Sequence, residues 1–546
     1  MNRPSKTYQS KSFLIDAIFV YKKNVFITAS GGAGKSHFLR ELKTIADEYG
    51  YKEEECVLTS TTGVSAYQLS GRTIHSWSGL LLPSNLTKMD ADTLRNSIQT
   101  VIKKISGSKK ASAIKKAKLL LIDEVSMLGG YYLEILDQVL RVVRRSEDVM
   151  GGLQLVMTGD MMQLPPCADV FVFESEVWSD LKLVTVFLET SYRFTDPNWS
   201  DLLTRCRIGE LTKRDRELLS SRVISREEFE KREDAEWKGG IRPTMLLPTN
   251  KLVEEMNQEE LERHPGEMFY FDSLDEVSTV VIEEKRVHKK QVSSTVPERK
   301  QIDAALEEHA EEVLMSSPVP VLMTPKIQDQ MDAIFPVEHY FRLKIGCPVM
   351  LRRNLNVDMG LVNGSRGRVI QIHRQAKAVL VQFEDYDSSS CPENSSIPWH
   401  LYNITEEQTE LLQDLSSRSF DCEWIFPIPF AHRELEHTEV VTSGLLSREA
   451  TTMTMKRLYT DYNRIQLPLT LCAAASIHKC QGMTLKSVII DVGKSIFADG
   501  QSYVALSRCK SLDGVYLLNL DLKKIRASKR SKSYEEELKK NAYFIK

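Results

Sequence analysis

The sequence predicts an α/β protein with two regions of mainly parallel sheet and a smaller β unit between them. Three observations lead to this class. Short apolar strands alternate with helical patterns over residues 1–195, which is typical of a parallel sheet covered by helices on both faces. The alternation returns over 464–518. Between these regions, short alternating runs with glycine-rich turns over 341–401 indicate a small β unit.

The strands that carry this prediction are short and apolar. In the first region they are Val25–Thr28, Cys56–Thr59, Leu119–Ile122, Leu155–Thr158 and Val184–Leu188. In the second half they are Pro243–Pro248, Pro348–Arg352, Gly367–His373, Ala378–Glu384, Leu467–Ala473, Ser487–Val492 and Gly514–Leu518. Tyr132–Arg144 has helical spacing, whereas the charged run Asp272–Ile334 is typical of a surface insertion. Ligands of such sheets bind beyond the carboxyl ends of the strands.

Length and composition are those of an ordinary globular chain. The 546 residues leave room for three or four domains, with 42% hydrophobic and 27% charged residues. No run of about twenty apolar residues is present, and the polar stretch Met1–Lys11 leads into no signal-peptide core. The nine cysteines form no C-x-x-C pair. We therefore expect no membrane span, no disulfide framework, and a reducing compartment, either cytoplasm or nucleus.

Charge gives a weaker indication of a nucleic-acid partner. The net charge of −3 does not favour one, but lysines cluster over 103–118 and basic residues over 523–532. Each cluster is either a solvated face or a surface that follows a phosphate backbone.

The stretch Val25–Leu39 is the element around which the chain is organised. An apolar strand is followed by a glycine-rich turn, a Lys-Ser pair and a helical pattern, which is the order of a phosphate-binding loop. Glycines let successive backbone N–H groups converge on a polyphosphate, and the helix N-terminus adds its positive dipole end. The predicted phosphate ligands are Gly31, Gly32, Ala33, Gly34, Lys35 and Ser36. Ala29 occupies the position where the usual motif has its first glycine.

Two further strands end in groups that suit phosphoryl transfer. Asp123 and Glu124 close an apolar strand. Together with the Ser36 hydroxyl, Asp123 can hold Mg²⁺, and Glu124 can orient and deprotonate an attacking water. Gln163 follows the next strand, where it can sense a γ-phosphate. We predict Lys35, Asp123, Glu124 and Gln163 as catalytic residues, with ATP and Mg²⁺ bound.

The whole set of motifs, taken in order, resembles the Pif-type (petite integration frequency) DNA helicases of superfamily one, group B. The matching stretches are Thr59–Ala66, Gly71–Trp77, Asp123–Met127, Gly159–Pro166, Leu188–Arg193, Arg207–Glu210, Leu343–Gly346, Asn363–Gly367, Gln466–Leu469, Ser476–Thr484 and Tyr503–Arg508. The departures are Ala29, Phe194 and the pair Cys472–Ala473.

The resemblance implies two RecA-like P-loop NTPase lobes with a small SH3-like β domain inserted in the second. The expected divisions are 1–195 for the first lobe, with a wedge at about 72–89, then 196–340 and 460–546 for the second lobe, and 341–459 for the insert. It also implies a monomeric motor that moves 5′-to-3′ on single-stranded DNA and unwinds 5′-tailed duplex DNA. Its setting would be replication, repair or recombination, where replication proteins are possible partners.

The resemblance also assigns residues outside the phosphate loop. Arg193 and Arg508 would neutralise charge on the γ-phosphate across the cleft, unless they are ordinary surface arginines. Gln481 and Gly482 would approach the nucleotide from the second lobe, and Gln9 is a rough candidate for reading adenine. The residues expected to contact nucleic acid are Thr59, Thr61, Thr62, His75, Trp77 and His478. Trp77 is equally consistent with a core position, and His478 with a packed histidine.

Three alternatives remain open from the sequence. The first is a RecD-like or RNA-directed helicase, and the second is a nucleotide-gated DNA-binding remodeller without processive unwinding. The third is a small-molecule kinase, which leaves Arg508 and the second α/β region without a role.

Overall fold

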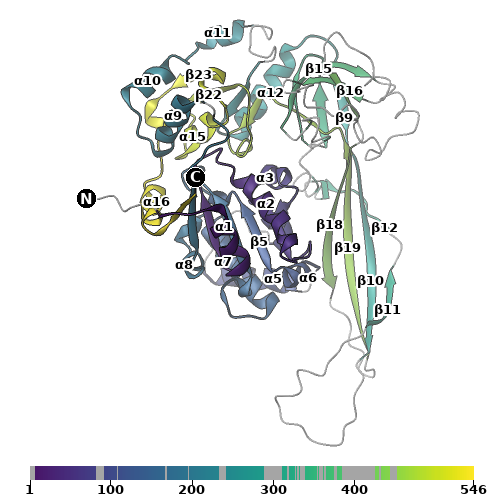
Figure 1. The fold of residues 1–546 in the computed structure, drawn as a ribbon. Helices are drawn as coiled ribbons and strands as arrows, with labels where there is room; N and C mark the ends of the chain where they lie inside the picture. Colours follow the sequence, from purple (N-terminus) through teal and green to yellow (C-terminus); the bar gives the residue numbers. More distant parts are fainter. Residues whose placement is uncertain are drawn as a thin grey trace, which may run out of the picture.

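The computed structural model describes residues 7–80, 91–106, 109–166, 169–194, 196–232, 242–287, 310–315, 319–325, 327–328, 331, 339–352, 355, 361, 364–373, 378–383, 425–429, 432–442 and 452–545. Two α/β lobes lie one above the other, and a small β unit with a long β arm lies beside them (Figure 1).

The first lobe is built on an eight-stranded sheet in which every neighbouring pair is parallel. Its order is β1 (Thr7–Tyr8), β24 (Tyr543–Ile545), β7 (Val184–Leu188), β2 (Val25–Thr28), β6 (Gln154–Gly159), β5 (Leu119–Asp123), β3 (Cys56–Ser60) and β4 (Arg72–Thr73). The central strands are buried on both faces, which explains their continuous apolar runs.

Helices cover both faces of this sheet. They are α1 (Lys11–Ile15), α2 (Lys35–Glu48), α3 (Gly63–Gln68), α4 (Ile74–Ser78), α5 (Ala91–Ser106), α6 (Lys109–Lys116), α7 (Gly130–Arg144) and α8 (Glu176–Asp180). One core contains side chains of α1 and α2, and the other contains side chains of α4 to α8. Because the sheet is held from both sides, the carboxyl ends of its strands form a fixed edge.

The second lobe has a smaller parallel sheet. Its order is β21 (Ala474–Ser476), β8 (Thr244–Leu247), β22 (Val488–Val492) and β23 (Val515–Leu520). The helices after the first lobe are α9 (Pro197–Ile208), α10 (Lys213–Ser220), α11 (Arg226–Lys231), α12 (Asn250–Arg263), α15 (Gln501–Leu506) and α16 (Lys529–Asn541).

The small β unit is a five-stranded antiparallel sheet. Its order is β17 (Ile425–Pro429), β16 (Ala378–Phe383), β15 (Arg366–His373), β14 (Pro348–Leu351) and β20 (Leu469–Leu471). The pair β9 (Phe269–Asp272) and β13 (Tyr340–Leu343) contributes Phe271 and Phe341 to the core of this unit.

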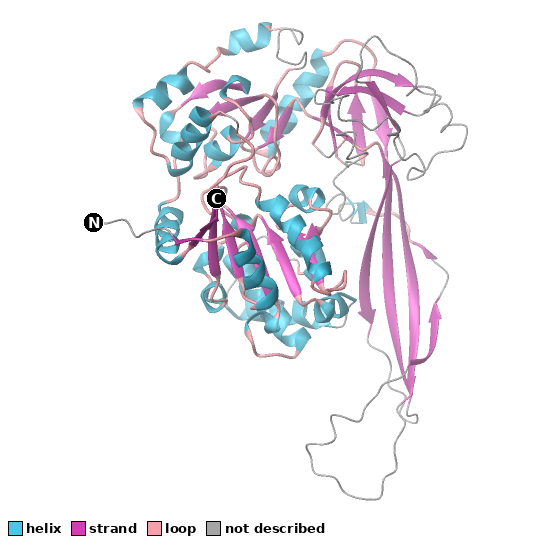
Figure 2. Cartoon of the chain, in the orientation of Figure 1, coloured by secondary structure: helices cyan, strands magenta, loops and turns pink. Residues whose placement is uncertain are grey.

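A long arm of strands extends from the small β unit past the first lobe (Figure 2). It contains β11 (Ala310–Met315), β10 (Leu274–Val287), β19 (Thr452–Gln466) and β18 (His432–Thr442), with β12 (Val319–Pro320) paired to β10. The 14 residues of β10 pair with β19 along their full length.

The predicted class, parallel α/β lobes with an antiparallel insert, is confirmed, but three elements differ from the expected division. β24 belongs to the first sheet, although 460–546 was expected in the second lobe. β10, expected in a charged surface insertion, is a paired strand; its charged residues hide the period-two pattern of a strand. β20, also expected in the second lobe, pairs with β14 of the small unit.

The expected wedge lies only partly in the described chain. Ile74 and Trp77 on α4 belong to the core of the first lobe, whereas 81–90 lies outside the described residues. Among the helices that the structure describes, none is long and apolar enough to cross a membrane.

Candidate nucleotide-binding site

The phosphate loop connects β2 to α2 at the carboxyl edge of the first sheet. Gly32 and Gly34 adopt positive φ angles of 86° and 81°, which glycine accepts without strain. A Cβ on Gly32 would lie 2.5 Å from Cβ of Arg193, so glycine is also required there by close approach. Ala29 has no positive φ, and its position therefore does not demand glycine.

Lys35 is buried within the loop. Its Nζ donates to the carbonyl oxygens of Ala29 at 2.9 Å and Ser30 at 3.1 Å. Burial lowers the pKa of Lys35, while the nearby carboxylates of Asp160 and Glu124 oppose that shift. The Lys35 ammonium can exchange its hydrogen bonds to these carbonyls for bonds to a bound phosphate, because neutral carbonyls are weaker partners than a charged phosphate.

Asp123 is the centre of a cluster of oxygen ligands. Ser36 Oγ donates to its Oδ2 at 2.6 Å and Ser65 Oγ donates to the same atom at 2.8 Å. Thr158 Oγ1 donates to Oδ1 at 2.5 Å. Carboxylate and hydroxyl oxygens are the donors that Mg²⁺ prefers, so the predicted pair of Ser36 and Asp123 lies together and has suitable chemistry.

Glu124 has a strained backbone and a shifted pKa. Its φ of 54° lies in the left-handed region, which is uncommon for a residue with a side chain. The conformation is held by Thr61 Oγ1, which donates to its carbonyl oxygen at 2.8 Å. Burial, reinforced by Asp123, raises the pKa of the Glu124 carboxyl. A buried carboxylate with a raised pKa is well suited to take a proton.

The second lobe contributes Gln481, Gly482 and Arg508 to the site, and Arg193 reaches it from the end of the first lobe. Gln481 Nε2 donates to Oε2 of Glu124 at 3.1 Å. Arg193 donates to the carbonyl oxygens of Ser507 at 3.2 Å and Gly482 at 3.4 Å. Arg508 is fully buried, and its guanidinium donates to the carbonyls of Val504, Cys480 and Met483 and to Ser507 Oγ. Neither arginine is therefore an ordinary surface side chain.

Gln163 reaches the same place from β6. Its Nε2 donates to Oδ2 of Asp160 at 3.3 Å, while its Oε1 is buried without a hydrogen-bond partner among the described residues. Gln481 Oε1 is likewise buried without a partner there. Unpaired buried oxygens are costly unless a ligand or water satisfies them, so both amides are consistent with a site that takes up a polar ligand.

Three residues that lie at the site, Asp160, Arg207 and Tyr503, were not predicted from the sequence. The Tyr503 hydroxyl accepts from the Gly31 N–H at 2.9 Å, so the second lobe touches the phosphate loop directly. Asp160 accepts from Tyr503 and Gln163, and Arg207 binds Asp160. Asp160, Arg207 and Tyr503 all lie in stretches that carried the family resemblance, which was the one available signal.

The three threonines expected to contact DNA have hydrogen-bond partners within the protein. Thr59 is 0% exposed and donates to the Leu121 carbonyl at 2.8 Å. Thr61 binds Glu124, and Thr62 Oγ1 accepts from the Ser65 N–H at 3.2 Å. In this structure the Thr59 hydroxyl is buried against the neighbouring strand β5, and DNA contact by the three threonines stays a prediction.

The three ring side chains behave differently from one another. Trp77 is 2% exposed and packs in the core of the first lobe, so the core alternative holds and stacking on bases is excluded in this conformation. His75 is half-buried, with its ring 4.6 Å from that of Tyr132. His478 is half-buried 6.4 Å from the exposed ring of Phe497. Burial lowers the pKa of both histidines. Gln9, the rough candidate for reading adenine, follows β1 at the carboxyl edge of the first sheet.

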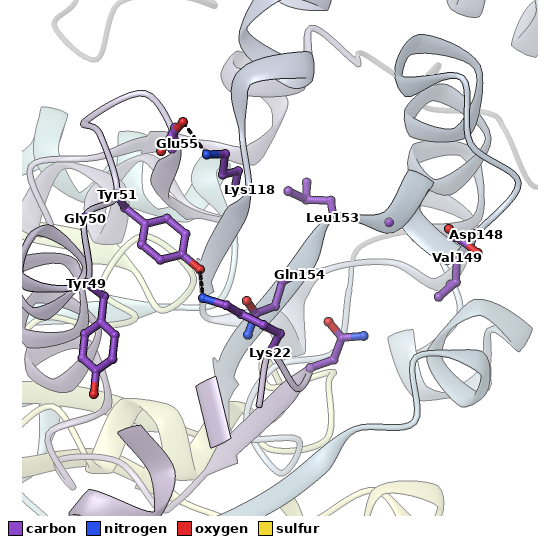
Figure 3. A pocket seen from close by; sticks show the side chains of 12 residues that line it. Lys22, Tyr49, Gly50, Tyr51, Glu55, Lys118, Asp148, Val149, Leu153 and Gln154 are labelled. Atoms are coloured by element: carbon purple, nitrogen blue, oxygen red, sulfur yellow. Dashed lines mark hydrogen bonds and ion pairs between the residues drawn. The ribbon is translucent and has the colours of Figure 1, made fainter. Parts of the chain in front are cut away.

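A surface pocket of about 540 Å³ lies away from this site (Figure 3). Asn24, Glu55, Lys118 and Leu153, which line it, lie at the amino ends of β2, β3, β5 and β6. The pocket therefore lies at the opposite edge of the sheet from the phosphate loop.

Two parallel α/β lobes that meet at one phosphate loop define the class of two-lobed P-loop proteins. The family model described as PIF1-like helicase matches residues 9–215, and the model described as DNA helicase Pif1, 2B domain, matches residues 326–372. The chain belongs to the PIF1-like helicase family.

Individual relatives agree with this assignment. The chain is 30% identical to ATP-dependent DNA helicase RRM3 of Saccharomyces cerevisiae over 551 residues, covering 96% of this chain and 66% of RRM3. This chain spans less than two thirds of the length of RRM3. It covers 61% and 59% of the lengths of two further curated relatives.

Solved structures show the same fold. Pif1 helicase from Candida albicans superposes with a TM-score of 0.63 at 24% identity, covering 98% of this chain and all of that one. Bacteroides Pif1 in complex with ADP-AlF3 and single-stranded DNA has a TM-score of 0.54 at 21% identity, covering 97% of this chain and 96% of that one.

Proposed function

We propose that the chain is an ATP-dependent DNA helicase that moves 5′-to-3′ along single-stranded DNA and unwinds 5′-tailed duplex DNA. The observation that carries the proposal is the hydrogen bond from Gln481 to Glu124, because it brings the second lobe onto the predicted base at the phosphate loop. Opening and closing of the lobes would then be coupled to the nucleotide. The relatives named as ATP-dependent DNA helicases, and the Bacteroides structure with ADP-AlF3 and DNA, support the substrates.

In this mechanism the triphosphate of ATP lies along the loop Gly31–Ser36. Ser36 and Asp123 would hold Mg²⁺, which when bound neutralises charge on the phosphates. Among the described residues, no three or more His, Cys, Asp or Glu side chains form a group that could hold a metal ion. Glu124 accepts the proton of the attacking water, and Lys35, Arg193 and Arg508 stabilise the developing negative charge.

The remaining parts of the proposal rest on the family. Single-stranded DNA would cross both lobes, contacting His75 in the first and His478 in the second. We propose a monomeric motor that works in replication, repair or recombination, in a reducing compartment. Four of the described cysteines support that compartment, because Cys56, Cys206, Cys347 and Cys480 are buried as free thiols.

A Glu124→Gln variant tests the proposal. Loss of the proton acceptor should lower DNA-stimulated ATP hydrolysis by about 10²- to 10⁴-fold and abolish unwinding, with ATP and DNA binding retained. The matched control is Glu53→Gln, at an exposed position of the same lobe. Unwinding that survives in Glu124→Gln would contradict the role of Glu124.

A second experiment separates the alternatives. Wild-type protein is offered DNA and RNA duplexes with 5′ or 3′ tails. The proposal predicts unwinding of 5′-tailed DNA. RNA unwinding would favour an RNA-directed helicase, and ATPase activity without unwinding would favour a remodeller.

A further inference from the structure

A chain of buried ion pairs leads from the nucleotide site to the C-terminal helix. Arg207, near the end of α9, donates to Oδ1 of Asp160 from Nη2 at 2.7 Å and from Nε at 3.0 Å. The same guanidinium donates from Nη1 to Oε1 of Glu535 at 3.0 Å and from Nη2 to Oε2. Exposure is 0% for Asp160, 7% for Arg207 and 5% for Glu535. Both edges of one buried guanidinium are thus held by carboxylates.

The three charges depend on one another. Burial alone would raise the pKa of Glu535, but Arg207 and Lys539 lower it to about 2. Burial disfavours the charge on Arg207, and the two carboxylates more than offset this by raising its pKa well above the usual range. A buried ion pair is destabilising unless its hydrogen bonds are complete, so removing one carboxylate leaves the guanidinium less firmly placed.

Asp160 connects these ion pairs to the nucleotide-binding site through its hydrogen bonds. It accepts from the Met162 N–H at 3.1 Å, from Gln163 Nε2 at 3.3 Å and from the Tyr503 hydroxyl at 3.4 Å. Tyr503 in turn holds Gly31 of the phosphate loop. The position of Asp160 therefore sets the position of the predicted γ-phosphate sensor Gln163.

Helix α16, which carries Glu535, is attached to both lobes. On the first lobe, Tyr534 accepts from Trp178 Nε1 at 2.6 Å and stacks on Phe173 with ring centroids 4.1 Å apart. Beyond α16, β24 pairs with β7. On the other side, Lys532 binds Glu210, which follows α9, at 3.0 Å. In Figure 1, α16 lies beside the junction of the two lobes.

We propose that Glu535 is a positioning residue for ATP hydrolysis, acting through Arg207 and Asp160 on Gln163. The proposal rests on the proposed function, since it assigns a role within the same site. Glu535 does not touch the site itself. Its carboxylate fixes the guanidinium that fixes Asp160, and so keeps the sensor amide ready for the γ-phosphate.

The test is steady-state ATP hydrolysis by Glu535→Gln in the presence of single-stranded DNA. We expect kcat to fall about 10- to 100-fold, with KM for ATP changed less than about threefold, because orientation is impaired and binding is not. The matched control is Glu536→Gln, the next residue of α16, which is exposed and should behave as wild type. Thermal melting and binding of a fluorescent ADP establish that each variant is folded.

A double-mutant cycle separates positioning from a purely structural role. Glu535→Gln is combined with Gln163→Ala, which removes the sensor amide. If Glu535 acts through Gln163, its substitution lowers kcat less than about threefold in the Gln163→Ala background. A structural defect would lower kcat by the same factor in both backgrounds.

Each outcome has a distinct meaning. Wild-type protein without DNA-stimulated hydrolysis would refute the proposed function. Active wild type with an equally active Glu535→Gln, or equal losses in both backgrounds, would refute the role of Glu535. If Glu535→Gln does not fold, Glu535→Asp replaces it, since this variant keeps the charge but shortens its reach, and the same cycle decides.

Discussion

Gln481 of the second lobe donates a hydrogen bond of 3.1 Å to Glu124 of the first lobe, and both side chains are almost fully buried. The bond favours the charged form of the carboxyl, whereas burial and Asp123 favour the neutral form. The protonation of the predicted general base therefore depends on contact between the lobes.

This dependence predicts the pH profile of ATP hydrolysis. Glu124 must be ionised to accept a proton, and its raised pKa means that the neutral form persists to higher pH. The acid limb of kcat should thus lie above the pKa of about 4.3 of an ordinary glutamate. Gln481→Ala removes a bond to the charged form and should shift the limb to still higher pH. The measurement is kcat between roughly pH 5 and pH 9, with the exposed Gln138→Ala as control. A limb that stays in place, or moves to lower pH, would contradict the coupling.

Arg508 should not be replaceable by lysine. Its guanidinium holds three backbone carbonyls and a hydroxyl at once, which an ammonium on a flexible stem does not reproduce. We expect Arg508→Lys to lower single-turnover ATP hydrolysis by about 10³-fold, the lower end for an arginine finger. DNA affinity, measured by fluorescence anisotropy, should change little. Arg526→Lys, at an exposed position, is the control. Hydrolysis within tenfold of wild type would show that the charge alone suffices.

The phosphate loop should tolerate glycine at position 29 but not alanine at position 32. Ala29 has no positive φ, so Ala29→Gly should leave KM for ATP within about threefold and lower stability by about 0.4–1 kcal/mol. In Gly32→Ala, the new Cβ would lie 2.5 Å from Cβ of Arg193 in a left-handed backbone, and ATP binding should be lost. Isothermal titration with ATP compares the two. A large gain in ATP affinity for Ala29→Gly would show that alanine at position 29 weakens ATP binding by the native loop.

Trp77 should matter for stability and not for DNA. Because it is buried in the core of the first lobe, Trp77→Ala should lower the free energy of unfolding by about 3–5 kcal/mol in urea titrations. DNA affinity of the folded protein should stay within about threefold. If Trp77 stacked on a base, the loss would instead be about 1–3 kcal/mol of binding free energy. His75→Ala, which alters a half-buried ring, provides the comparison and should show the reverse pattern.

The part of the site that lies on one sheet could be predicted from the sequence. Lys35 and Ser36 come after β2 and Asp123 ends β5, and the carboxyl ends of such parallel strands meet at one edge of the sheet. Local spacing therefore brings them together without any knowledge of the tertiary fold.

The contacts between the lobes could not be predicted in this way. Arg207 and Glu535 are 328 residues apart, and nothing in either local sequence indicates the other. The burial of Thr59 and Trp77 could not be predicted from the sequence either. Both residue types suit either a DNA-binding surface or a core, and only the packing of the folded chain decides between them. The partner of β10 was hidden for the same reason, since β19 lies far along the chain.

The position of β24 between β1 and β7 has a consequence for how the chain is made. The strands that flank it come from residues 7–8 and 184–188, whereas β24 itself is residues 543–545. A chain that folds as it leaves the ribosome can form the interior of the first sheet early, but β24 can pair with β1 and β7 only after residues 543–545 have been synthesised. Until then β7 presents an open parallel edge, which is prone to mispairing. The described strands of the second-lobe sheet end by residue 520, so this sheet can form before β24 joins the first.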